Sequence, residues 1–223
     1  MTTVLNMHGS TGQIEVLKDG PEQPLAVAIV AHPHPLLGGN ANHKVPFTLA
    51  RTLNRLGVLT WRPNSRGIGQ SEGEFDHGNL ETEDLLQLAA QLVAQHPELP
   101  LFLVGFSFGA HICARTARAL LTSGKNLKDL IVCGMPHGQV SHDRQYESPI
   151  ASQACIIHGE LDENVPLQQA FDWADQAKLP VSVIPGADHF FSGKLNILSR
   201  IVSDRVELQL LASCSMGNGG GSR

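Results

Sequence analysis

The hydrophobic positions along the chain follow two alternating patterns. Short continuous apolar runs, such as residues 25–31 (Leu-Ala-Val-Ala-Ile-Val-Ala), have the length and composition of strands buried on both faces. Longer segments carry apolar residues every three or four positions, as Leu195, Leu198 and Val202 do within residues 194–212, which is the period of a helix with one buried face. The alternation of these two patterns predicts a mostly parallel sheet with helices on both faces.

These elements fill most of the chain and predict a single α/β domain over residues 1–212. The predicted strands are residues 25–31, 58–61, 101–104, 130–133, 154–158 and 181–184. The predicted helices are residues 41–56, 79–96, 110–121, 167–178 and 194–212. Residues 213–223 end in a run rich in glycine, so we expect a flexible tail there.

Charge and composition exclude several classes of protein. With 16 Lys and Arg against 21 Asp and Glu, the 223-residue chain has a formal net charge of −5 and lacks the basic surface typical of nucleic-acid binding. No apolar run approaches the ~20 residues of a membrane span. Residues 1–20 also lack the features of a signal peptide, so we expect a cytoplasmic protein with neither a membrane nor a nucleic-acid partner. The widely spaced cysteines favour reduced thiols over disulfides or a zinc site: Cys113, Cys133, Cys155 and Cys214.

The clearest chemical motif is Gly105-Phe-Ser107-Phe-Gly109, a G-x-S-x-G sequence between a predicted strand and a predicted helix. In this context a serine adopts a strained turn and projects its hydroxyl above the sheet, while the two glycines allow strand and helix to pack closely. The N-terminus of the following helix favours negative charge that develops nearby. We therefore predict that Ser107 is a nucleophile.

A nucleophilic serine needs a base and an acid that orients the base. In this architecture they follow in the order serine, aspartate or glutamate, histidine. We predict that His189 is the base, because it lies in a loop after the strand at 181–184, at the edge where open α/β sheets bind their ligands. The other candidates are His111, His137, His142 and His158.

The predicted acid is Asp162, which lies in the loop after the strand at 154–158. Glu160 and Glu163 flank it in the same loop and are alternatives. Asp143 would take the role if the acid followed the preceding strand instead. Asp188 is adjacent to the predicted base, and the side chains of adjacent residues usually diverge, so it is a poor partner.

An oxyanion in this architecture is held by two backbone N–H groups. One belongs to the residue after the nucleophile, here Phe108, and the other to the loop after the first buried strand. In that loop Pro33 and Pro35 have no N–H, so His34 between them is the predicted second donor.

Two other chemistries are possible for the same segments. His32, His34 and His43 are close enough in sequence to suggest a metal site, but no nearby cysteine or carboxylate completes a ligand set and two prolines restrict the rings. Residues 66–73 nearly match G-x-G-x-x-G, but Glu72 replaces the third glycine and no Walker lysine is present. We therefore expect neither a metal nor a cofactor.

Several segments together resemble the small bacterial α/β-hydrolases of the dienelactone-hydrolase-like type over residues 12–212. The matching segments are HPHPLLGGN at 32–40, RGIGQSEG at 66–73, FDHG at 75–78, GFSFGA at 105–110, HGELDENVP at 158–166 and GADHFF at 186–191. The resemblance implies an α/β-hydrolase fold and a serine hydrolase with Ser107, Asp162 and His189 as its triad. Dienelactone hydrolases proper use cysteine as the nucleophile, so the serine favours ester hydrolysis in general over the lactone substrate.

The connection between two predicted strands, residues 134–153, is too short for the helical lid of lipases. We therefore expect an open, shallow site whose rim includes Phe106, Phe108, Phe190 and Phe191, although these aromatic residues equally suit a core. The predicted function is a carboxylesterase that cleaves a small ester or thioester. An acyl, peptidyl or lactone hydrolase, and a catalytically silent binding module on the same fold, are the alternatives.

Overall fold

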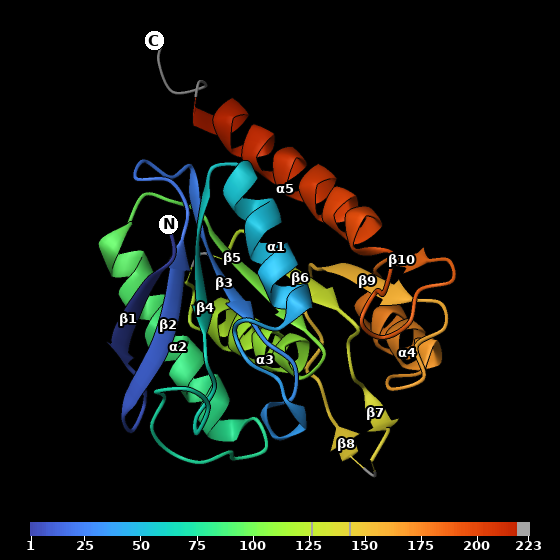
Figure 1. Cartoon of the computed structure of the whole chain (residues 1–223). Helices are drawn as coiled ribbons and strands as arrows, with labels where there is room; N and C mark the ends of the chain where they lie inside the picture. Colours follow the sequence, from blue (N-terminus) through green and yellow to red (C-terminus); the bar gives the residue numbers. More distant parts are fainter. Residues whose placement is uncertain (126, 143, 218–223) are drawn as a thin grey trace.

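Eight strands form one sheet in the computed structural model, which describes residues 1–217 except 126 and 143 (Figure 1). Their order is β1–β2–β4–β3–β5–β6–β9–β10, and every neighbouring pair from β4 to β10 is parallel. The antiparallel strands β1 and β2 lie at one edge. The strands are β1 (Thr3–His8), β2 (Gln13–Asp19), β3 (Ala26–Ala31), β4 (Val58–Pro63), β5 (Leu101–Phe106), β6 (Asp129–Cys133), β9 (Cys155–Gly159) and β10 (Val181–Ile184).

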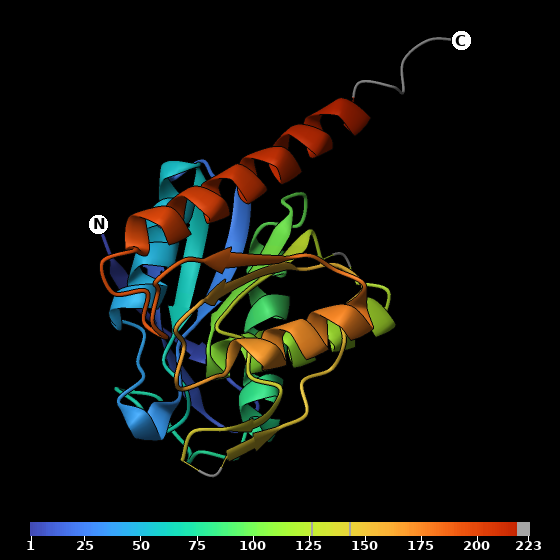
Figure 2. The same ribbon diagram turned by 90° about the vertical axis from the view of Figure 1, so that its right-hand side faces the viewer.

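Helices cover both faces of this sheet. They are the short 3₁₀ helix η1 (Pro35–Leu37) and the α-helices α1 (Lys44–Arg55), α2 (Asn79–Gln95), α3 (Phe108–Thr122), α4 (Leu167–Ala177) and α5 (Leu195–Gly217). One core packs α1 and α5 against the sheet and the other packs α2, α3 and α4, and Figure 2 shows α5 and α4 on opposite sides of β9 and β10. All residues of β3 are buried, as its continuous apolar run predicts.

The predicted alternation of parallel strands and helices is confirmed, and the differences lie mainly at the edges. The sequence analysis did not predict β1 and β2, whose residues are partly exposed and alternate between the two faces of an edge hairpin. It also missed the separate antiparallel hairpin of β7 (Gly138–Val140) and β8 (Arg144–Tyr146), which lies in the connection predicted to be too short for a lid.

The last helix extends beyond its predicted end. Helix α5 ends at Gly217, so residues 213–217 are helical where the sequence predicted the start of a flexible tail. These residues contain no proline and no glycine before Gly217, and nothing in them terminates a helix. The remaining residues of the predicted tail, 218–223, lie outside the described residues.

A buried ion pair joins the glycine-rich loop between β4 and α2 to helix α2 itself. Nε of Arg66 lies 2.7 Å from Oδ2 of Asp84, and the two side chains are 4% and 6% exposed. The same guanidinium donates to the hydroxyls of Ser10 (2.9 Å) and Thr11 (2.7 Å), in the turn between β1 and β2. Arg66 belongs to the segment that nearly matches a nucleotide-binding loop. Its guanidinium instead binds side chains of the protein itself.

We expect Asp84→Ala to lower the free energy of unfolding by roughly 3–5 kcal/mol, because it leaves the Arg66 guanidinium buried without an opposite charge. Urea denaturation measures the loss. Asp175→Ala is the control, since it removes an ion pair with Lys178 in which both side chains are largely exposed. The control should cost about 1 kcal/mol or less. Equal losses in the two variants would contradict a special role for the buried pair.

Candidate active site

Ser107 lies on a tight turn between β5 and α3, and two glycines make the turn possible. Its backbone has φ 55° and ψ −122°, and its N–H donates to the carbonyl of Cys133 at 2.8 Å. A Cβ on Gly105 would lie 2.3 Å from the carbonyl oxygen of Gly109, and one on Gly109 would lie 2.4 Å from that of Ala31. Only glycine fits these two positions, so the motif serves close packing of the helix on the sheet.

His189 bridges Ser107 and Asp162. Its Nε2 lies 3.0 Å from Oγ of Ser107, and its Nδ1 lies 2.7 Å from Oδ2 of Asp162. An ionised carboxylate only accepts hydrogen bonds, so Nδ1 carries the proton and Nε2 is free to accept from the serine hydroxyl. The imidazole packs against the rings of Phe106 and Phe190, with centroids 4.9 Å and 5.1 Å away.

Asp162 is fixed from two sides. Its Oδ1 accepts the backbone N–H groups of Asn164 (3.0 Å) and Val165 (2.8 Å), and its side chain has no exposure to solvent. Its Oδ2 faces His189 and also lies 3.3 Å from Nε2 of His158. Because the backbone holds one oxygen, the other keeps a fixed direction toward the imidazole.

Among the acids that the structure describes, those considered as alternatives to Asp162 make no hydrogen bond to the His189 ring. Glu160 accepts the N–H of Gly186 on the exposed side of the loop, and Asp188 accepts the N–H of Ser192. Glu163 is exposed. Asp143, the candidate after the preceding strand, lies outside the described residues.

The competing histidines have other partners. His158 is fully buried beneath the acid and its Nε2 donates to the carbonyl of Val165 at 2.9 Å, while burial lowers its pKa. Nδ1 of His111 donates to Oγ of Ser148, and His137 contacts Gln176. His142 lies on the β7–β8 hairpin and is exposed.

The site opens into a cleft of about 340 Å³. Its lining residues come from the loop after β3, the start of α1, the β5–α3 turn, the β7–β8 hairpin and the loops after β9 and β10: Pro33, His34, Leu37, Gly39, His43, Ser107, His142, Arg144, Asn164, His189 and Phe190. Figure 1 shows η1 and the β7–β8 hairpin at the same end of the molecule. This is the end to which the carboxyl termini of the parallel strands point.

The aromatic rim predicted from the sequence is wrong for three of its four residues. Phe106, Phe108 and Phe191 are buried in the cores, and only Phe190, 36% exposed, lines the cleft. Phe106 and Phe191 pack with the α1 and α5 core, and Phe108 packs with the opposite one. The hairpin supplies polar residues to the rim in their place.

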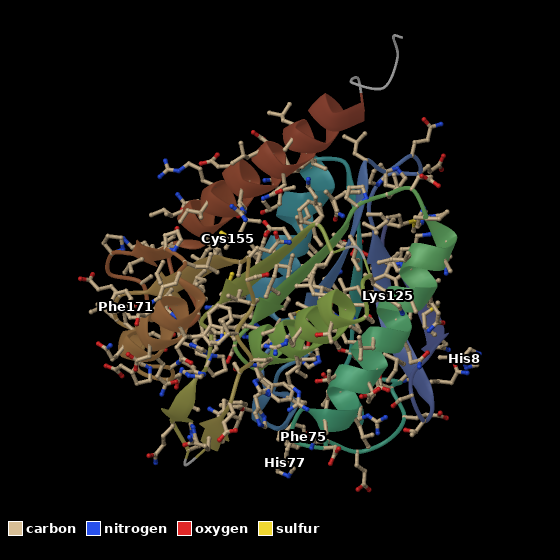
Figure 3. All side chains as sticks on the ribbon, turned by 180° about the vertical axis from the view of Figure 1, so that it is seen from behind. His8, Phe75, His77, Lys125, Cys155 and Phe171 are labelled. Carbon is tan, nitrogen blue, oxygen red and sulfur yellow. The ribbon has the colours of Figure 1, made fainter. Side chains whose placement is uncertain are left out.

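Two backbone N–H groups near Ser107 have no hydrogen-bond acceptor within the described part of the protein. Phe108 is the first residue of α3, where an N–H has no intrahelical partner. Among the hydrogen bonds of the described residues, none involves the N–H of His34, whose carbonyl accepts from Leu37 and Gly39 and so fixes the turn. The His34 ring packs between Phe108 and Phe75, which comes from the loop before α2 and lies beside His77 in Figure 3.

His32, one of the histidines considered as metal ligands, uses both ring nitrogens for hydrogen bonds within the protein. Nδ1 of His32 donates to the carbonyl of Pro33 at 2.6 Å, and Nε2 accepts the N–H of Ser65 at 2.9 Å. Both ring nitrogens are therefore engaged, and burial lowers the pKa of His32 to about 4. Within the described part of the chain, no group of three ligating side chains could hold a metal ion.

Fold and site together define an α/β serine hydrolase without a lid domain. The chain belongs to the family described as serine aminopeptidase, S33, whose sequence profile matches residues 36–170. The matched segment contains Ser107 and Asp162 and ends before His189.

Solved and curated relatives agree with this class. A lidless α/β serine hydrolase of Xanthomonas campestris is 33% identical, with a TM-score of 0.80 over 92% of this chain and 94% of that one. An uncharacterized protein of Rickettsia prowazekii is 30% identical over 207 residues, which cover 88% of this chain and 85% of the relative. A dienelactone hydrolase of Anabaena variabilis shares the fold, with a TM-score of 0.69, 15% identity and coverage of 92% and 95%. The resemblance inferred from the motifs is confirmed.

None of the helices in the described residues combines the length and apolar character needed to cross a bilayer.

We expect His32 to make stability depend on pH. Its pKa is about 4 in the folded protein and 6.5 when unperturbed, so between these values the unfolded chain binds a proton that the folded one does not. Its stabilising contribution is full above pH 6.5 and decreases as the pH falls toward 4, by about 1.4 kcal/mol per pH unit.

His32→Gln should lower the slope of stability against pH by about 1.4 kcal/mol per pH unit, while the slope due to His34 and His111, whose pKa values are also about 4, remains. Urea denaturation between pH 4.5 and 8 measures it, and the difference between variant and wild type should stay constant from pH 7 to 8. An unchanged slope in the variant would mean that the folded protein already protonates this ring.

Proposed function

We propose that the protein is a carboxylesterase that cleaves small esters or thioesters through an acyl-enzyme on Ser107. The observation that carries this proposal is the continuous hydrogen-bond chain from Ser107 Oγ through His189 to Asp162, open to a cleft at Ser107. A serine hydroxyl becomes a nucleophile when an oriented base can remove its proton, and this chain has the required geometry.

In the proposed mechanism, Oγ of Ser107 attacks the acyl carbon while Nε2 of His189 takes its proton. Asp162 accepts the hydrogen bond from Nδ1 and stabilises the resulting imidazolium, while two backbone N–H groups hold its other oxygen in place. The N–H groups of Phe108 and His34 would stabilise the oxyanion. His189 then protonates the leaving alcohol or thiol, and acts again as base when water attacks the acyl-enzyme.

Cleavage of a peptide from its amino end is the second candidate, because the family's description names an aminopeptidase. Such an enzyme must bind a positively charged amino group, for which a carboxylate is the usual partner. Among the described residues that line the cleft there is no carboxylate. The lining therefore favours an ester over a peptide with a free amino terminus.

We expect Ser107→Ala to abolish labelling by a fluorophosphonate probe and to lower ester turnover by about 10³–10⁶-fold. Asp162→Asn should lower turnover by about 10⁴-fold, since it can hold the imidazole in the wrong tautomer, whereas Asp143→Asn should change it little. Probe labelling and initial rates on an aryl ester measure both effects. A labelled Ala variant, or the reverse ranking of the two aspartates, would refute the assigned roles.

The open cleft predicts a preference for short acyl chains. Each buried CH₂ contributes about 0.8 kcal/mol, but only as far as the cleft removes it from water. We expect kcat/KM for 4-nitrophenyl esters to peak at acyl chains of roughly two to six carbons and to show no increase at a lipid–water interface. Rates that keep rising with longer chains would point to a covered acyl channel instead.

A further inference from the structure

Arg144 lies on β8 and lines the same cleft as Ser107, but the proposed mechanism gives it no role. Its guanidinium donates to three acceptors among the described residues: the carbonyl of Ser141 (3.0 Å), the hydroxyl of Ser141 (3.2 Å) and the hydroxyl of Tyr146 (3.3 Å). All three are neutral. Arginine has five N–H donors, so one N–H remains on each terminal nitrogen, which suffices for a bidentate carboxylate.

The body of the protein holds Arg144 in this position. The N–H of Ser141 donates to the carbonyl of Asn164 (3.0 Å), in the same loop as Asp162. At the other end of the hairpin, Oγ of Ser148 donates to the carbonyl of Pro136 (2.7 Å) and accepts from Nδ1 of His111 (2.7 Å). These bonds join the hairpin both to the acid loop and to α3, and the hairpin in turn holds the guanidinium at the cleft.

The described lining of the cleft contains a positively charged side chain, Arg144, and no negatively charged one. The other ionisable groups that line it are histidines, and burial lowers the pKa of His34, to about 4, and of His43. These two rings are neutral at pH 7, and no carboxylate lines the cleft within the described residues. Asp162 has no exposure to solvent beneath His189. Arg144 is thus a permanent positive charge with no counter-charge from the described lining.

We propose that Arg144 binds a carboxylate on the substrate, so that the protein prefers monoanionic esters over neutral esters of the same shape. The planar fork of a guanidinium matches the two oxygens of a carboxylate, and its charge balances that of one carboxylate. This inference rests on the proposed esterase function and names the substrate class for the same site. Arg144 acts in binding and takes no part in the proton transfers.

Matched substrates test the proposal. 4-Nitrophenyl hydrogen fumarate carries a carboxylate on the acyl part where 4-nitrophenyl crotonate carries a methyl group. 3-Carboxyphenyl and 3-methylphenyl butanoate form the same pair on the alcohol part. We expect the wild type to favour the anionic member of at least one pair by about 10–100-fold in kcat/KM, mainly through KM. The pair that responds identifies the part of the substrate that Arg144 contacts.

Three variants assign the preference to Arg144. Arg144→Gln should remove the preference, because it lowers kcat/KM for the anionic ester about 10–100-fold more than for the neutral ester. Arg144→Lys should retain part of the preference, because the charge stays while the planar fork is lost. Arg118→Gln is the control, since it removes an equal charge from an exposed position on α3.

The outcomes separate this inference from the proposed function. If the wild type neither reacts with a fluorophosphonate probe nor cleaves the neutral esters, the esterase proposal fails. If it cleaves them without preferring an anionic member, or if Arg144→Gln keeps the preference, the carboxylate proposal fails and the esterase proposal stands. Equal losses on both members of each pair in Arg144→Gln would show that the arginine only supports the hairpin.

Discussion

The packing of the first turn of α3 on β5 and β3, at Gly105 and Gly109, is the contact on which the site depends. The backbones approach so closely that a Cβ on Gly105 would overlap the carbonyl oxygen of Gly109, and a Cβ on Gly109 would overlap that of Ala31 at the end of β3. This approach leaves Ser107 in a backbone conformation with positive φ, which costs of order 1–3 kcal/mol and persists only when surrounding structure imposes it. Buried strands on both sides, β3 and β6, impose it, and α3 begins at the next residue, Phe108, whose N–H has no intrahelical acceptor.

The sequence predicted the centre of the sheet better than its edges, for a physical reason. Strands buried on both faces, such as β3 and β5, are continuous apolar runs that few other structures produce. Strand β1 lies at the edge of the sheet and Val4 is 59% exposed, so its sequence lacks the apolar run that marks a buried strand. Strands β7 and β8 have three residues each, which is too short for any periodic pattern to be recognised.

The same contrast applies to the site. Ser107, Asp162 and His189 could be predicted because chain order and the ends of the parallel strands restrict where such residues lie. The contact of His158 with Asp162 could not, since it depends on the path of the loop after β9. The placement of Arg144 in the cleft could not either, because it follows from hydrogen bonds between a hairpin and segments far away in the sequence.

The distribution of charge around the cleft differs from that of the whole chain, whose formal net charge is −5. At physiological ionic strength, exposed charges farther away than about 8 Å are largely screened, so carboxylates elsewhere on the surface act weakly on a group inside the cleft. A guanidinium in the lining acts at contact distance, where screening is small. Selection of an anionic ester would therefore occur after the encounter, in the affinity of the bound complex, while the overall negative charge gives no electrostatic help to its approach. For this reason a preference set by Arg144 belongs in KM rather than in the rate of association.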